Sequence, residues 1–142
     1  MPADPDPIEL AARALQHRDR SRQQLDERLA RAGVDDAGRA EALETLERVG
    51  YVDDDRYALA RAEALAQRGY GDDGIRHLLE ADGLPADTVT AALAGLEPEP
   101  QRAADLVARL GPGAKTAAHL GRKGFGEDAI EAAAGEAGGG MG

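Results

Sequence analysis

The stretch Gly50-Tyr51-Val52-Asp53-Asp54-Asp55-Arg56-Tyr57-Ala58, followed by Arg68-Gly69-Tyr70-Gly71, carries the clearest structural signal of this chain. It lies inside an internal repeat. The pairs Gly33-Val34, Gly83-Leu84 and Gly124-Phe125 can be superposed, and each glycine has a leucine four residues before it. The spacing is 50 residues (83 − 33) and then 41 (124 − 83). Periods of this size indicate stacked supersecondary units, each too small to bury a core alone.

Apolar residues recur at helical spacing throughout the chain, and no segment alternates as a strand would. Ser21 is expected to cap a helix that ends at Gly33. The pattern predicts an all-α chain of three tandem three-helix repeats. We expect the repeats at residues 8–50, 51–97 and 98–137, and disordered tails at 1–7 and 138–142.

Carboxylates stand at the expected starts of two helices in the middle repeat. Asp53 or Asp54 is expected to cap the helix that ends at Gly69, and Asp72 or Asp73 the helix closed by Gly83. A run of carboxylates at a helix start usually serves as a cap with a favourable dipole interaction, so we favour this role over a cation site.

The composition of the chain excludes several kinds of site and of cellular location. The 142 residues contain no Cys, which excludes disulfides, thiolate chemistry and cysteine zinc sites. No apolar run approaches the ~20 residues needed to span a bilayer, and the acidic, proline-rich start is unlike a signal peptide. We therefore expect a cytoplasmic protein that makes no membrane contact.

Neither a catalytic constellation nor a cofactor site is apparent. The segment 111–116 resembles a phosphate loop, but that motif requires Gly at the two positions that Ala114 and Arg109 occupy. His17, His77 and His119 are spread one per repeat without neighbouring ligands or a nucleophile. The sequence predicts no enzyme, no cofactor and no metal.

Several segments resemble the RecX family of regulatory proteins. They are Gly50-Tyr51-Val52-Asp53-Asp54-x-Arg56-Tyr57-Ala58, Arg68-Gly69-x-Gly71 with Ile75 and Leu79, Arg122-Lys123-Gly124-Phe125, and Arg20-Ser21 with Leu25, Leu29 and Gly33. The resemblance covers residues 8–135. It implies an elongated, curved protein that binds the RecA–DNA filament and modulates, usually inhibits, the recombinase. It also implies roles in homologous recombination, DNA repair and the SOS response.

Two sets of residues are candidates for sites. The expected partner-binding residues are basic: Arg20, Arg22, Arg56, Arg68, Arg122 and Lys123. Arg56 stands at a helix start, where its charge opposes the dipole, so either a partner contact or an ion pair with a neighbouring Asp would explain it. The expected repeat-packing residues are Tyr51, Tyr57, Gly69, Ile75, Leu79 and Phe125.

The net charge of −10 opposes stable binding to free duplex DNA, which is a polyanion. Basic clusters at both ends of the chain could still meet phosphates if another protein supplies most of the affinity. We therefore expect a monomer that binds the RecA filament and binds free DNA weakly or not at all. The alternatives are a helix-turn-helix-like DNA-binding protein and a helical-repeat scaffold for another partner.

Overall fold

A computed structural model describes residues 6–139, with side chains over 6–135, and this part of the chain contains helices and no strand. The all-α prediction is confirmed. The expected tails at 1–7 and 138–142 fall mostly outside these residues, although the first helix begins at Pro7 and the last runs to Gly139. The helices are α1 (Pro7–His17), α2 (Arg22–Arg31), α3 (Asp36–Arg48), α4 (Asp54–Gln67), α5 (Asp72–Ala81), α6 (Ala86–Ala94), α7 (Glu99–Leu110), α8 (Ala114–Arg122) and α9 (Glu127–Gly139).

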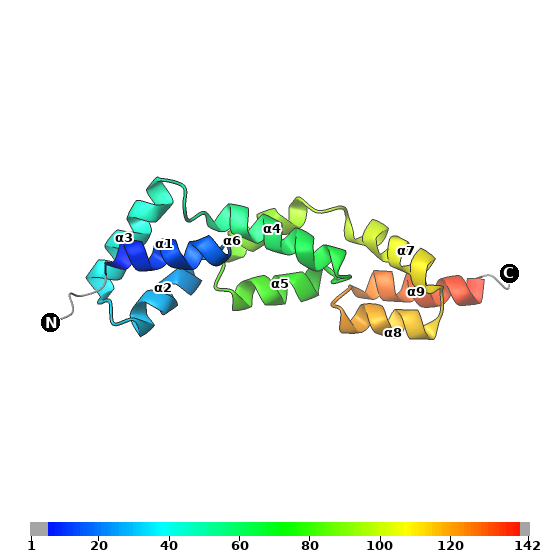
Figure 1. The fold of residues 1–142 in the computed structure, drawn as a ribbon. Coiled ribbons are helices and arrows are strands. Elements are labelled where there is room, and N and C mark those ends of the chain that lie inside the picture. The colour runs from blue at the N-terminus through cyan, green and yellow to red at the C-terminus, as the bar shows by residue number, and fades with distance from the viewer. Residues whose placement is uncertain (1–5, 140–142) are drawn as a thin grey trace.

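The helices follow one another in three groups along an elongated molecule (Figure 1). The first group is α1–α3, the second α4–α6 and the third α7–α9. Each group surrounds its own cluster of buried apolar side chains. We propose that each group is one repeat, with the boundaries expected from the sequence. The middle helices α2, α5 and α8 lie along one edge of the molecule (Figure 1).

Local capping signals determine most helix ends. The Ser21 hydroxyl accepts a hydrogen bond from the Gln24 amide, and the Asp53 carboxylate accepts one from the Arg56 amide. The backbone turns at Gly33, Gly83 and Gly124 have φ of +90°, +84° and +84°. Because L side chains rarely adopt this conformation, glycine ends each middle helix at the same place.

The expected cap of α5 by Asp72 or Asp73 is wrong. The N-cap is Gly71, which has no side chain to donate or accept, and both aspartates lie in the first turn. The first amides of α5 instead bond to the third group. Gly71 donates to the Lys123 carbonyl at 2.8 Å, Asp72 to the Glu99 carboxylate at 3.0 Å, and Asp73 to the Gly124 carbonyl at 3.0 Å. A contact with the next group therefore satisfies the amides that every helix start leaves without a partner.

Glycines on both sides of the contact allow the second and third groups to approach this closely. A Cβ at Gly71 would lie 2.5 Å from the Phe125 nitrogen, and a Cβ at Gly124 would lie 2.5 Å from the Gly74 Cα. Backbone meets backbone here, so a side chain could not be accommodated by a rotamer change.

We call each contact between neighbouring groups a joint. The joint between the first and second groups repeats the arrangement. The Ser21 hydroxyl donates to the Asp82 carbonyl at 2.8 Å, and the Arg22 amide donates to the Asp54 carboxylate at 2.8 Å. In both joints, the start of a middle helix contacts two places on the following group. One is the carbonyl that ends the next middle helix, and the other is a carboxylate on the first residue of the next leading helix, Asp54 or Glu99.

The third group is expected to open first. Among the large side chains that the structure describes in this group, only Leu120 is fully buried, whereas the second group fully buries Leu65, Ile75, Leu79 and Val89. Each such side chain contributes about 1.5–3 kcal/mol when removed from water. Hydrogen exchange should therefore show weaker amide protection in α7–α9 than in α4–α6. The reverse ranking would contradict the expectation.

Gly69→Val is expected to destabilise the protein by about 1 kcal/mol or more, because a β-branched side chain disfavours the left-handed backbone. Gly69 has φ of +89°, and a Cβ there would meet only the end of the Leu106 side chain, 3.9 Å away. The cost is therefore mainly conformational. Urea unfolding measures it, and an unchanged midpoint would show that the turn tolerates a side chain.

Candidate functional site

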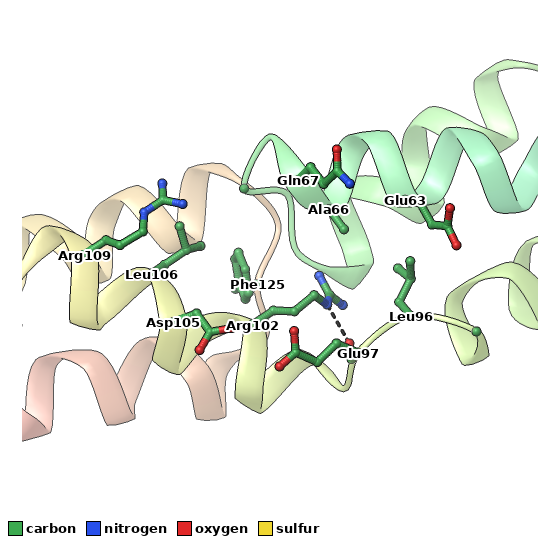
Figure 2. Close-up of a pocket in the computed structure, with 12 residues that line it drawn as sticks. Glu63, Ala66, Gln67, Leu96, Glu97, Arg102, Asp105, Leu106, Arg109 and Phe125 are labelled. Carbon is green, nitrogen blue, oxygen red and sulfur yellow. Dashed lines mark hydrogen bonds between the residues drawn. The ribbon is translucent and has the colours of Figure 1, made fainter.

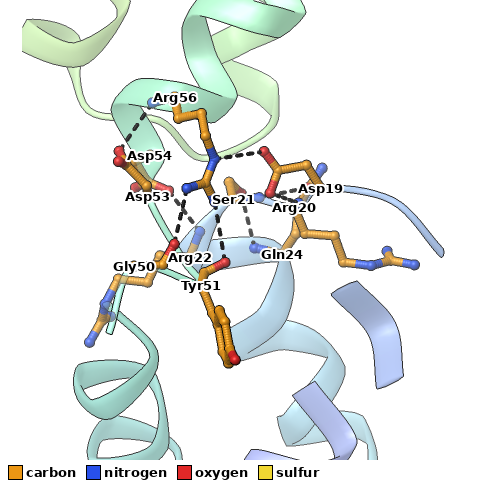
Figure 3. A network of polar contacts seen from close by, with 10 residues as sticks. All are labelled: Asp19, Arg20, Ser21, Arg22, Gln24, Gly50, Tyr51, Asp53, Asp54 and Arg56. Atoms are coloured by element: carbon orange, nitrogen blue, oxygen red, sulfur yellow. Dashed lines mark hydrogen bonds and ion pairs between the residues drawn. The ribbon is translucent and has the colours of Figure 1, made fainter. Parts of the chain in front are cut away.

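Arg56 makes several polar contacts within the chain, although about half of its side chain stays exposed. Its guanidinium donates to the carbonyls of Gly50 at 3.0 Å and Tyr51 at 3.3 Å, and lies 3.6 Å from the Asp19 carboxylate (Figure 3). The ion pair is with Asp19 of the first group, and not with one of the aspartates that neighbour Arg56 in the sequence. Arg56 fastens the start of α4 to the loop before it and to the first group.

Arg102 makes the equivalent contacts between the second and third groups, and the sequence did not lead us to predict its role. Its guanidinium donates to the carbonyls of Glu97 at 2.8 Å and Tyr70 at 2.9 Å, and pairs with the Asp72 carboxylate. Only 8% of the residue is exposed, and it lies between the second and third groups (Figure 2). Both arginines therefore connect the first turn of a leading helix to a carboxylate of the preceding group.

The expected partner residues Arg20 and Arg22 are also engaged internally. Arg20 donates to the Ala14 carbonyl at 3.3 Å, and burial lowers the pKa of its guanidinium. The Arg22 guanidinium pairs with the Glu47 carboxylate. Their charges are consequently less accessible to a partner than the sequence suggested.

Other cations remain on the surface and have no ion pair within the described residues. In the third group they are Arg109, Lys115 and Arg122. In the first group they are Arg18, Arg28, Arg31 and Arg48. Among the described helices α8 alone carries no carboxylate, so its Lys115 and Arg122 are not neutralised along the helix. This makes α8 the most electropositive helix and a candidate contact for an anionic partner surface.

The last two predicted partner residues differ in exposure. Lys123 is half-buried, with its ammonium 4.2 Å from the centre of the Tyr70 ring. Arg68 is exposed and lies 6.0 Å from the centre of the same ring. The Tyr70 ring thus lies near two cations, and the Tyr70 carbonyl accepts a hydrogen bond from Arg102.

The residues expected to pack the repeats are mostly in the cores. Ile75, Leu79 and Phe125 are buried, and Tyr57 packs against the second cluster. Tyr51 is a correction, because 63% of it is exposed. Its neighbour Val52 enters the first core instead, so the preceding ring is left on the surface. The Tyr51 backbone is still bonded: its amide donates to the Leu46 carbonyl and its carbonyl accepts from Arg56.

Tyr57 should make stability sensitive to alkaline pH. Burial and the 2.8 Å hydrogen bond that its hydroxyl donates to Asp82 raise the pKa of Tyr57. A raised pKa in the folded state favours folding below the ordinary value of about 10, and this contribution disappears as pH rises through the folded value. Urea midpoints should thus fall more steeply above that pH in the wild type than in Tyr57→Phe. Parallel curves would contradict the assignment.

An open cleft of about 460 Å³ lies between the second and third groups (Figure 2). Leu96, Leu106 and Phe125 form apolar parts of its wall, and Glu63 and Asp105 lie on its sides.

The described residues hold no cluster of three His, Asp or Glu side chains able to bind a metal ion. None of the described helices is long and apolar enough to cross a membrane.

The chain is similar to curated proteins of known family. The "Regulatory protein RecX" of Xanthomonas axonopodis pv. citri (strain 306) is 33% identical over 137 residues, which cover 89% of this chain and 85% of the relative. The protein of the same name from Stenotrophomonas maltophilia (strain R551-3) is 32% identical over 142 residues, covering 93% and 87%. The chain belongs to the RecX family of regulatory proteins.

Solved structures of RecX proteins have the same fold. The crystal structure of RecX from Lactobacillus salivarius superposes with a TM-score of 0.76 at 18% identity, covering 89% of this chain and 91% of the other. A second crystal structure, described as regulatory protein RecX, gives 0.72 at 19% identity and covers 89% and 71%. No family model matches the sequence.

Proposed function

We propose that this RecX protein binds the filament that the RecA recombinase forms on DNA and lowers its activity in homologous recombination, DNA repair and the SOS response. The observation that carries the proposal is the similarity to RecX regulators over nine-tenths of the chain. In this role the protein acts by binding, without catalysis or a cofactor, as a monomer in the cytoplasm.

The charge distribution supports a partner that combines protein and DNA. With 27 acidic and 17 basic residues, the chain as a whole is repelled by a phosphate backbone. The exposed cations of α8, and Arg18, Arg28 and Arg31 in the first group, provide local attraction at opposite ends of an elongated molecule (Figure 1). Contacts at both ends, made at once on a long filament, raise the overall affinity through effective concentration.

The contacts between groups support the same proposal. Arg102 bonds to the Tyr70 carbonyl and the Asp72 carboxylate of the second group, and Arg56 pairs with Asp19 of the first, so polar contacts oppose bending between the two basic ends. A fixed spacing reduces the entropy lost when both ends bind. A regular filament is a partner that presents binding positions at a constant repeat.

ATP hydrolysis by RecA on single-stranded DNA tests the proposal. The rate is measured with increasing amounts of the purified chain, and we expect it to fall with dose. The heat-unfolded chain is the control for nonspecific effects. An unchanged rate at a several-fold excess of the chain over RecA would contradict inhibition.

A further inference from the structure

Each joint leaves an open cleft beside its arginine, and the two clefts occupy equivalent places. The first cleft, beside Arg56, has a volume of about 530 Å³, and the second, beside Arg102, is the one of about 460 Å³ in Figure 2. The leading helix of the preceding group lines each cleft with three residues, and the two sets lie 51 residues apart: Ala12, Leu15 and Gln16 on α1, and Glu63, Ala66 and Gln67 on α4. The same framework therefore forms both clefts.

Two carboxylates of the second cleft stand where the first cleft has neutral residues. Glu63 takes the place that Ala12 has on α1. Glu97 takes the place of Tyr51, because each of these residues gives its backbone carbonyl to the arginine five positions further along the chain. Since the first joint forms without a carboxylate at either place, the framework of the joint does not explain Glu63 or Glu97.

These two carboxylates and a third, that of Asp105, are exposed and have neither a hydrogen bond nor an ion pair within the described residues. Arg102 does not neutralise them, because its guanidinium donates to two carbonyls and pairs with Asp72. The other cation in the lining is Arg109, at one end of the cleft (Figure 2). Three carboxylates therefore surround the second cleft against one available guanidinium, which makes it electronegative.

The wall between these carboxylates is apolar. Leu106 and Phe125 belong to the core of the third group and Leu96 packs against that of the second, so both cores hold the wall in place (Figure 2). Apolar surface in contact with water contributes binding free energy when a partner covers it. The carboxylates repel phosphates, so this cleft does not suit a nucleic acid.

We propose that the second cleft binds a segment of a protein partner in which apolar side chains lie between lysine or arginine side chains. The apolar side chains cover the wall, and the flanking cations meet the three carboxylates. These come from α4, from the link between α6 and α7, and from α7, so an extended segment reaches all of them where a single small cation cannot. The inference does not rest on binding of the chain to RecA.

A labelled peptide, Lys-Lys-Leu-Leu-Lys-Lys, is the probe, and fluorescence anisotropy with the full chain measures its dissociation constant. Two further peptides separate the apolar from the charged contribution. One has serine in place of both leucines, and the other has glutamate in place of every lysine.

Two triple variants of the chain separate the cleft from net charge. The first neutralises the carboxylates of the cleft: Glu63→Gln, Glu97→Gln and Asp105→Asn. The matched control neutralises three other exposed carboxylates, on α3 and α6, that have no ion pair within the described residues: Glu41→Gln, Glu44→Gln and Asp87→Asn. Each triple changes the net charge by +3, from −10 to −7.

We expect the cleft triple to weaken binding of the lysine–leucine peptide about tenfold and the control triple about twofold or less, because only the cleft carboxylates contact the peptide and the rest act through screened net charge. The serine peptide should bind the wild type several-fold more weakly, and the glutamate peptide should not bind.

Amide NMR spectra recorded during the titration locate the contact. Shifts should gather at residues 63–69, 95–97 and 102–109, and the spectrum of the cleft triple, unchanged away from these residues, should show that it is folded. Equal losses of affinity from the two triples, shifts spread over the whole acidic surface, or binding of the glutamate peptide in the cleft would each overturn the proposal.

Discussion

Gly124→Ala is expected to destabilise the third group by about 3 kcal/mol, the combined cost of a left-handed backbone and an overpacked contact. Gly124 has φ of +84°, and its new Cβ would lie 2.5 Å from the Gly74 Cα. The obstacle is backbone, so relief requires the third group to move away from α5. That movement would also break the hydrogen bonds from Gly71 and Asp73.

Gly33→Ala is the matched control. It ends the first middle helix with φ of +90°, as Gly124 ends the third, but nothing lies within 4 Å of its added Cβ. Its cost should be only about 1 kcal/mol, from the backbone conformation alone. Urea unfolding, with hydrogen exchange to locate the loss, measures both variants. Equal effects would show that the joint adapts to a side chain and is looser than its contacts imply.

The double reversal Lys115→Glu with Arg122→Glu is expected to weaken binding to the RecA filament tenfold or more, which corresponds to about 1.4 kcal/mol or more. Both cations are exposed on α8, which has no carboxylate of its own. If they meet phosphates, the slope of log affinity against log salt should also decrease by about two. Fluorescence anisotropy over a salt series measures both quantities.

Arg13→Glu with Arg48→Glu is the control for net charge. Each double reversal changes the net charge by −4, from −10 to −14, and both control residues are exposed. Arg13 and Arg48 lie on α1 and α3, away from the edge formed by the middle helices (Figure 1). A loss of affinity as large as that of the α8 variant would indicate general repulsion and remove the assignment of α8.

Signals that act within one turn could be predicted from the sequence. Ser21 and Asp53 cap the expected helices, and Gly33, Gly69 and Gly83 have the expected left-handed backbone. These features depend on the residue and its nearest neighbours, so sequence spacing is enough to identify them.

Contacts between groups could not be predicted in the same way. Asp72 was expected to cap α5 but pairs with Arg102, thirty residues further along the chain, and Arg102 was missed for the same reason. Two signals could have found this joint. Gly71 and Gly74 together at a helix start have no local purpose, and Arg102 follows the start of its helix much as Arg56 does.

The measurement that most directly tests the central claim compares binding to two targets at physiological salt: RecA filaments activated by nucleotide on DNA, and the same DNA without RecA. Net repulsion between the acidic chain and DNA, offset only at its basic ends, predicts that the chain binds the filament far more tightly than the bare DNA. Tight binding to bare duplex, with no effect on ATP hydrolysis by the filament, would contradict it and identify a DNA-binding protein instead.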